Sequence, residues 1–312
     1  MLIVTGFPWV SVCGYGAHIK STQQILTIQK NRIVEEYPLE SVGHLLIVGG
    51  HTINSSTINT LLKKGIFISF FESDGTPVGT IRPFEEEVHP GLIALQQEIP
   101  RQRFATALAQ GSIKSRLNTI RLAEDKQASG LLYEGELELL HNSLDEIGYL
   151  IKLDEIRRLH RLTADMYYEI MARNLPADFG FRRRTLRPQT DPVNAMLSLG
   201  YAMLYGSCCV SIIGAHLNPD YGFLHDGKGG LVRDLIEPLK AGMIDSVVFS
   251  FVKESLSPAH FECTNDRCLL SDDLAKELMR SFYTSINTKK INDQVLGTLH
   301  AIRDNDEFIV LY

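Results

Sequence analysis

One histidine and two acidic residues lie close together in the segment PDYGFLHDGKGGLVRDLIEP, residues 219–238. Asp234 and Glu237 are three positions apart, so on a helix their side chains leave from one face. Two carboxylates can share a divalent cation, and a tight GKGG turn would fold His225 back over the start of that helix. Such a set of nitrogen and oxygen donors suits manganese and tolerates magnesium. In the alternative interpretation these residues have structural roles only. Asp234 is then a first-turn acid favoured by the helix dipole, Glu237 is a solvated partner of Lys240, and His225 is an ordinary hydrogen-bonded histidine.

A second cluster consists of four arginines in the short loop FRRRTLRP, namely Arg182, Arg183, Arg184 and Arg187. Guanidinium groups this close repel one another unless anions lie between them, and their forked donors match phosphate oxygens. The loop therefore indicates a phosphodiester substrate. The alternative is a loop whose arginines pair with nearby acids such as Asp178 and Asp191.

Composition limits the kind of protein. The chain has 312 residues, of which 44% are hydrophobic, which is enough for two domains with real cores. Acidic residues outnumber basic ones, 37 to 31, and give a net charge of −6. The overall field therefore does not favour nucleic acid, and any face that binds DNA must be a local cluster of basic residues.

The cysteines and the start of the chain indicate a reduced, cytoplasmic protein. The five cysteines form no paired framework, and MLIVTGFPWV lacks the basic start and cleavage pattern of a signal peptide. Cys263 and Cys268 in ECTNDRC are interpreted as two surface thiols, because no second pair exists to complete a zinc site.

One long segment, residues 193–219, contains no Asp, Glu, Lys or Arg. Serines, an asparagine and glycines interrupt the apolar run, so we expect a buried central helix rather than a membrane span. Asp191 is expected to cap this helix and Pro192 to occupy its first position, where no amide hydrogen is needed.

The pattern changes near residue 86. Before it, short β-rich runs such as HLLIVGG and GIFISFFES predict a small, mostly antiparallel sheet, with one helix in NSSTINTLLKKG. After it, apolar residues recur at three- and four-residue spacing. The predicted fold class is α+β, with a β-rich domain (1–86), a linker (87–94) and a larger all-α catalytic domain (95–312). Residues 253–270 have no pattern that identifies their role.

Two stretches together resemble a known family. LPADFGFRRRTLRPQTDPVNAMLSLGYAMLY and NPDYGFLHDGKGGLVRDLIEPL are similar to the CRISPR-associated Cas1 family of spacer-acquisition integrases and endonucleases. The similarity is dense over residues 175–240 and coarse over the rest of the chain. Lys114 and Asn118 in IKSRLN also resemble the Lys-x-x-x-Asn helix of that family.

The resemblance implies a function. It implies a metal site of Glu, His and a third acid that binds magnesium or manganese, with His225 as the histidine, Glu237 as the third acid and Asp234 as a second acid nearby. It also implies a homodimer formed through the β-rich domain, a small Cas2 partner protein, and insertion of a short DNA duplex by attack of its 3′ hydroxyl groups. The arginine loop and Lys114 are then the candidate DNA-binding residues.

The first carboxylate of this pattern is missing. The matching segment is HRLTADMYY, which places His160 where the family has glutamate. Glu155 and Asp165 are each five positions away, about 140° around a helix, and therefore do not replace it. The exchange should weaken magnesium most, since magnesium prefers oxygen, and favour manganese. The alternative makes His160 a surface residue beside a degraded site.

Three functions remain open at this point. The first is a metal-dependent integrase and nuclease that uses His225, Glu237, Asp234 and His160. The second is a weakly active or inactive member that binds DNA, double-stranded or branched, and serves in assembly. The third is a stand-alone relative that integrates other DNA.

Overall fold

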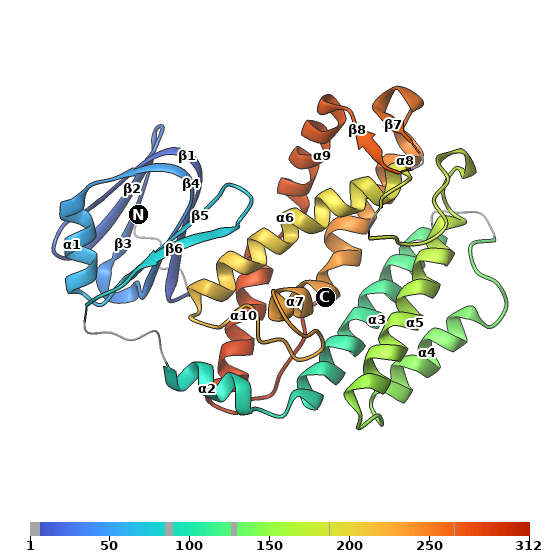
Figure 1. Ribbon diagram of the computed structural model, residues 1–312, viewed down its shortest axis with the longest axis horizontal. Helices are drawn as coiled ribbons and strands as arrows, with labels where there is room; N and C mark the ends of the chain where they lie inside the picture. The colour runs from blue at the N-terminus through green and yellow to red at the C-terminus, as the bar shows by residue number, and fades with distance from the viewer. Residues whose placement is uncertain (1–6, 85–89, 126–129, 187, 265) are drawn as a thin grey trace.

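A computed structural model describes residues 7–84, 90–125, 130–186, 188–264 and 266–312, and shows a β-rich part beside a larger helical part (Figure 1). The α+β prediction is confirmed. Six strands form one sheet in the order β3-β2-β1-β4-β5-β6. Their bounds are β1 (Trp9–Ser21), β2 (Ile25–Lys30), β3 (Ile33–Pro38), β4 (His44–Ile53), β5 (Phe67–Phe71) and β6 (Pro77–Ile81), with the short helix η1 (Leu39–Ser41) before β4.

The sheet is mixed, whereas the sequence predicted a mostly antiparallel one. Strand β4 lies parallel to both β1 and β5, while the three outer pairings are antiparallel. The crossover between β4 and β5 is α1 (Ser55–Lys63), capped by Asn54, whose side chain accepts a hydrogen bond from Thr57 N at 2.8 Å. Residues 44–48 of β4 are all buried, the pattern of a parallel strand covered on both faces.

The two faces of the sheet belong to different cores. On one face Leu45 and Ile47 pack with Leu61 of α1. On the other face Trp9, Leu46 and Val48 join the large apolar core of the helical part. The β-rich part is therefore packed against the helices through one face of its sheet.

The helical part begins earlier than the sequence predicted. Helix α2 (Pro90–Glu98) starts inside the expected linker, of which residues 87–89 lie outside the described residues. The remaining helices are α3 (Arg101–Asp125), α4 (Glu136–Ile147), α5 (Leu153–Ala172), α6 (Pro192–Gly214), α7 (Gly230–Lys240), α8 (Ser246–Glu254), α9 (Asp272–Ser285) and α10 (Thr288–Arg303). Short turns are η2 (Ala177–Phe179), the π-helical η3 (Ala241–Asp245) and η4 (Pro258–His260).

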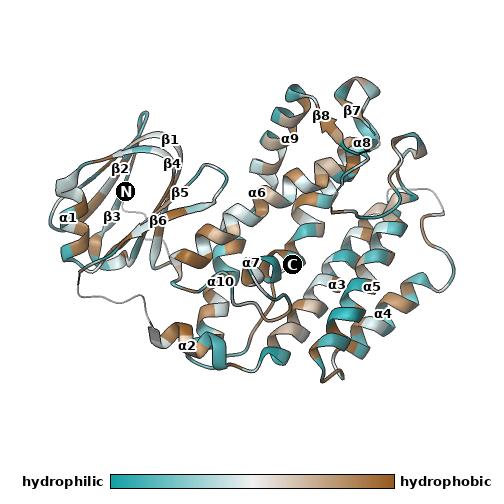
Figure 2. Ribbon diagram, in the orientation of Figure 1, coloured by the Kyte–Doolittle hydropathy of each residue, from teal (hydrophilic) through white to brown (hydrophobic). Residues whose placement is uncertain are grey.

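Helix α6 is the buried centre that the sequence predicted. Asp191 caps it by accepting a hydrogen bond from Asn194 N at 2.8 Å, and Pro192 is its first residue. Among the described residues, α6 is the one helix that is long enough and apolar enough to cross a membrane. Of its most apolar stretch, however, 56% is buried inside the protein. It contacts α7, α8, α9 and α10, and it runs through the middle of the helical part, where the ribbon is pale to brown (Figure 2).

Residues 253–270, which the sequence left without a role, contain a small hairpin. Strands β7 (Phe261–Cys263) and β8 (Cys268–Leu270) pair antiparallel and are the exception to an all-α domain. Cys263 and Cys268 face each other and form a disulfide, so the interpretation as two free thiols was wrong. Cys268 N donates to the carbonyl of Gln189 at 2.7 Å, which fixes the hairpin beside the loop that precedes α6.

The β-rich part also touches α6 through glycine. The turn between β5 and β6 places Gly75, at φ +86°, against Gly206 of α6. A Cβ atom added to Gly206 would lie 1.7 Å from the carbonyl oxygen of Asp74. The two backbones therefore meet with no room for a side chain on the helix.

This contact yields a stability prediction. Gly206→Ala should lower the free energy of unfolding by about 2 kcal/mol or more, because overpacking forces backbone shifts. The matched control is Gly297→Ala in α10, where a Cβ meets nothing within 4 Å, and which should raise stability by about 0.5–1 kcal/mol through helix propensity. Urea denaturation followed by circular dichroism measures both changes. A Gly206→Ala protein as stable as the wild type would contradict the close contact.

Candidate active site

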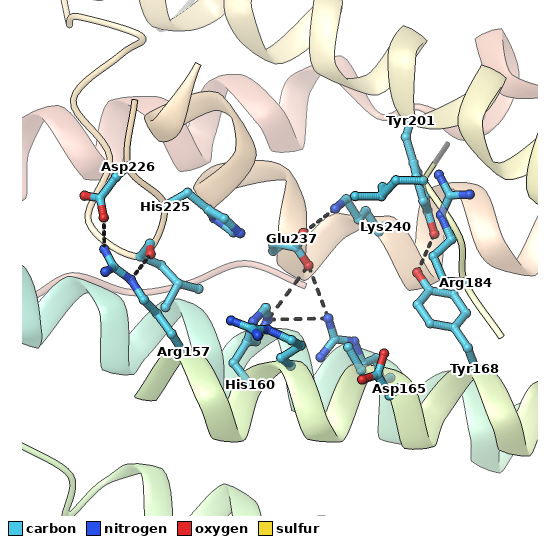
Figure 3. A pocket seen from close by; sticks show the side chains of 15 residues that line it. Arg157, His160, Asp165, Tyr168, Arg184, Tyr201, His225, Asp226, Glu237 and Lys240 are labelled. Carbon is cyan, nitrogen blue, oxygen red and sulfur yellow. Dashed lines mark hydrogen bonds and ion pairs between the residues drawn. The ribbon is translucent and has the colours of Figure 1, made fainter. Parts of the chain in front are cut away.

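A pocket of about 490 Å³ opens between α3, α5, α6, α7 and the loops that precede α6 and α7 (Figure 3). Five cationic side chains line it against three carboxylates, so the pocket is positive although the whole chain is negative. The charged lining residues are Arg116, Arg157, Arg161, Arg184, Lys240, Asp165, Asp226 and Glu237. His160, His225, Tyr168 and Tyr201 complete the polar part of its wall.

His225 is folded back onto α7, as the sequence predicted. The turn that achieves this uses Gly227 and Gly229 at φ +76° and +67°, a conformation that L side chains rarely adopt. Nδ1 of His225 lies 2.7 Å from Oδ1 of Asp234, and the backbone N–H of His225 donates to the same carboxylate at 2.8 Å. A carboxylate can only accept, so Nδ1 carries the proton of the neutral ring and Nε2 keeps its lone pair.

Asp234 itself is fully buried and does not line the pocket. Besides His225, its carboxylate accepts the backbone N–H groups of Phe223 and Leu224, the latter at 3.0 Å. The expectation that Asp234 shares a cation with Glu237 is therefore corrected, because protein donors occupy both of its oxygens. Its position is that of the carboxylate that typically orients a metal-binding histidine.

Glu237 forms the expected pair with Lys240, but in a buried setting, since its side chain is only 10% exposed. Lys240 contacts Oε1, and Arg116 Nη2 lies 3.2 Å from Oε2. Burial alone would raise the pKa of Glu237, but the Lys240 ammonium and the Arg116 guanidinium hold that pKa well below its usual range. Glu237 is therefore ionised.

His160 is not a surface residue, so that interpretation of the departure from the family pattern was wrong. It is 7% exposed and lines the pocket, with Nε2 at 3.8 Å from Oε2 of Glu237. Arg116 Nη2 lies 3.4 Å from the same nitrogen, and because arginine only donates, Nε2 is the unprotonated nitrogen. Burial, followed by the charge of Arg116, lowers the pKa of His160 to about 3.

These donors fit a divalent cation in their chemistry. His160 offers a neutral imidazole with a lone pair on Nε2, His225 directs Nε2 away from Asp234, and Glu237 is a carboxylate; such a set of nitrogen and oxygen donors suits manganese better than magnesium. They are not yet gathered around one point, since the two rings are 6.5 Å apart. Within the described residues, no three His, Cys, Asp or Glu side chains already lie together as a group that could hold a metal ion.

The arginine loop divides into two kinds of residue. Arg184 lines the pocket and is held by Asn194 Oδ1 at 2.8 Å and Ser198 Oγ at 2.9 Å, both on α6. Arg182 and Arg183 are exposed, and Arg187 lies outside the described residues. Asp191, one of the acids expected to pair with this loop, instead accepts two hydrogen bonds from Asn194.

Lys114 does not reach the pocket. It is exposed on α3, about 200° around the helix from Arg116, which is the residue of that segment that lines the pocket. Sequence reasoning missed Arg116, although a basic residue at a buried position of an apolar helix face was visible in IKSRLN. Asp165, which was set aside as lying too far around α5, is exposed and lines the pocket too.

A buried tyrosine network behind the pocket was also missed. The hydroxyls of Tyr168 and Tyr201 lie 2.6 Å apart, and Tyr201 donates to Asp245 in the π-helical turn that follows α7. Tyr167 donates to the other oxygen of Asp245 at 3.0 Å. Only Tyr167 and Tyr168 are adjacent in sequence, so no local spacing could have predicted this set.

Comparison with known proteins identifies the family. The family model described as CRISPR associated protein Cas1 matches residues 10–284. A putative CRISPR-associated endonuclease Cas1 of Methanospirillum hungatei JF-1 is 39% identical over 96% of this chain and 99% of its own length. A CRISPR-associated endonuclease Cas1 of Thermus thermophilus is 28% identical over 86% of this chain and 83% of its own.

Solved structures share the fold. A casposase bound to its integration product superposes with a TM-score of 0.83 at 18% identity and covers 97% of both chains. A chain of a partial Cas6-RT-Cas1–Cas2 complex gives 0.79 at 18% identity, with 98% of both chains covered. The architecture is thus that of Cas1 proteins and a casposase. The chain belongs to the CRISPR-associated Cas1 family, as its sequence motifs indicated.

The buried state of His160 predicts a pH dependence of stability. The pKa of His160 is about 3 in the folded protein and about 6.5 in the unfolded chain. Between these two pH values the unfolded chain therefore binds a proton at His160 and the folded protein does not. The stabilisation is complete above pH 6.5 and is lost as the pH falls. Between pH 7.5 and 5 the metal-free wild type should lose about 2 kcal/mol more unfolding free energy than His160→Gln. Urea titrations of both proteins at each pH would measure the unfolding free energies. An equal dependence of unfolding free energy on pH in the two proteins would contradict the prediction.

Proposed function

We propose that this protein is a metal-dependent DNA endonuclease and integrase of CRISPR adaptation, which inserts short DNA duplexes by 3′-hydroxyl attack on a phosphodiester. The observation that carries the proposal is the gathering of His160, His225 and Glu237 in a positively charged pocket. The relatives named as CRISPR-associated endonucleases, with the first aligned over almost the whole chain, support the same activity.

The cation would be held by Nε2 of His225, Nε2 of His160 and the carboxylate of Glu237, and would polarise the phosphodiester and stabilise the oxygens of an in-line displacement. Asp234 holds the His225 ring in the tautomer that leaves Nε2 free. Lys240 and Arg184, both in the pocket wall, offset the negative charge of the phosphate. Manganese is the preferred ion, because two of the three donors are imidazoles.

The proposed partners are DNA, a second copy of the chain and a small Cas2 protein. Arg182 and Arg183 present exposed guanidinium groups on the loop that also supplies Arg184 to the pocket, and are suited to the DNA backbone. The structural relatives include a Cas1–Cas2 complex and a casposase bound to its integration product. The β-rich part is proposed as the dimerisation domain.

A second candidate is a DNA-binding assembly subunit with little catalysis. One observation favours it: the carboxylate of Glu237 is already held by two protein cations, Lys240 and Arg116. Integration of other DNA by a stand-alone protein is the third, in keeping with the casposase-like fold.

Cleavage and strand transfer on a branched DNA duplex, with manganese and magnesium in parallel, separate the active enzyme from the assembly subunit. Wild type should act better with manganese, and His225→Ala should reduce the rate by at least about 100-fold, since loss of an outer partner of a metal ligand alone costs about 10- to 100-fold. His18→Ala, at an exposed position of β1, is the matched control and should leave the rate unchanged. DNA binding by a wild type that is silent with both ions would favour the assembly role and contradict the proposal.

The arginine loop yields a separate prediction about salt. Changing both Arg182 and Arg183 to Gln should lower the slope of log affinity against log salt by about 2, without altering sequence preference, because each contributes one phosphate contact. Lys114→Gln, on the far side of α3 from the pocket-lining Arg116, serves as the comparison and tests its assignment to DNA. Fluorescence anisotropy at several salt concentrations measures the slopes, and an unchanged slope for the loop variant would remove the loop from the DNA interface.

A further inference from the structure

Arg116 lies between the two groups that a metal would bridge. It enters from α3, is 5% exposed, and places Nη2 at 3.4 Å from His160 Nε2 and 3.2 Å from Glu237 Oε2. These two acceptors are themselves 3.8 Å apart. One guanidinium nitrogen therefore contacts both, at the side where their lone pairs converge.

A divalent cation bound to both groups would meet this guanidinium. Metal bonds to imidazole nitrogen and carboxylate oxygen are about 2.0–2.2 Å long, so an ion held by His160 and Glu237 would lie against Nη2 of Arg116. Arginine stays protonated under all ordinary conditions, and two positive charges at such a distance in a buried pocket repel strongly. Metal and guanidinium therefore exclude each other at this position.

We propose that Arg116 is a resident cation that competes with the divalent metal for His160 and Glu237, so that the metal binds only when the guanidinium moves aside. This inference rests on the proposed metal-dependent function and deepens it. Without metal, the guanidinium of Arg116 occupies the place of the ion and neutralises the carboxylate of Glu237.

Three features make the guanidinium exchangeable. Its Nη1 atom is buried and has no hydrogen-bond partner within the described part of the chain, so Arg116 is incompletely satisfied where it lies. Glu237 keeps Lys240 on its other oxygen, so departure of Arg116 does not leave the carboxylate unpaired. His160 adds a third: a neutral imidazole holds Arg116 more weakly than a carboxylate at that position would.

Manganese binding by the full-length protein without DNA tests the competition directly. Isothermal titration should show Arg116→Gln binding Mn²⁺ at least about tenfold more tightly than the wild type. Arg121→Gln is the matched control, because Arg121 also lies on α3 and also contacts a histidine, His141 at 3.2 Å, but at an exposed site outside the pocket. Its manganese affinity should equal that of the wild type. Adding His160→Ala to Arg116→Gln should abolish the gain.

Manganese affinity in Arg116→Gln equal to or weaker than in the wild type, with an unchanged circular dichroism spectrum, would overturn the inference. Arg116→Met, which fills the same space without charge, gives the same expected gain and replaces Arg116→Gln if that variant fails to fold. The cleavage assay separates this result from the proposed function. If manganese binds about tenfold more tightly but no variant cuts DNA, the competition is supported and the proposed nuclease function is contradicted. If DNA is cut in a metal-dependent way but manganese affinity does not rise, only the competition is contradicted.

Discussion

The geometry of the candidate active site depends on one buried carboxylate. Asp234 accepts hydrogen bonds from three consecutive backbone N–H groups and from Nδ1–H of His225. The same carboxylate therefore both closes the glycine-rich turn against α7 and sets the tautomer of the histidine. A buried carboxylate is costly unless its acceptor sites are filled, and here donors from one turn fill both oxygens. The turn and the orientation of His225 are therefore one structural unit, and Glu237 reaches the pocket from the next turn of the same helix.

The second constraint is electrostatic. A chain with net charge −6 gathers five cationic side chains around a single pocket, where field lines concentrate and anionic substrate is attracted. Two of them, Lys240 and Arg116, keep the pKa of Glu237 low, while burial and then the charge of Arg116 lower the pKa of His160. The pocket therefore favours a polyanion and keeps the candidate metal ligands His160 and Glu237 unprotonated. Each protein cation near Glu237, however, also repels a metal ion. His160, at the position where the family resemblance leads us to expect a glutamate, adds no negative charge to attract the ion, because its imidazole is neutral in this buried setting.

Local chemistry was predictable from the sequence and long-range pairing was not. The Asp191 cap with Pro192, the helix α1 and the return of His225 over α7 each follow from neighbouring residues and were expected. Asp234 was expected to share a cation with Glu237 but is the buried partner of His225, because spacing shows that the two acids share a face but not which of them is buried. Arg116 and Asp245 reach the site from other helices, and the Cys263–Cys268 disulfide depends on a hairpin that its short strands did not reveal. The parallel β4 was visible as an uninterrupted apolar run but was interpreted as an ordinary strand.

The contact between Gly75 and Gly206 also has a mechanical consequence. Because two backbones meet with no side chain between them, no rotamer can adjust to absorb a displacement, and the β5–β6 turn is fixed against α6 by direct backbone contact. At its other end the same helix carries Asp191 and Asn194, which hold the arginine loop. One continuous helix thus joins the backbone contact with the sheet, at Gly206, to the residues that hold the arginine loop beside the pocket.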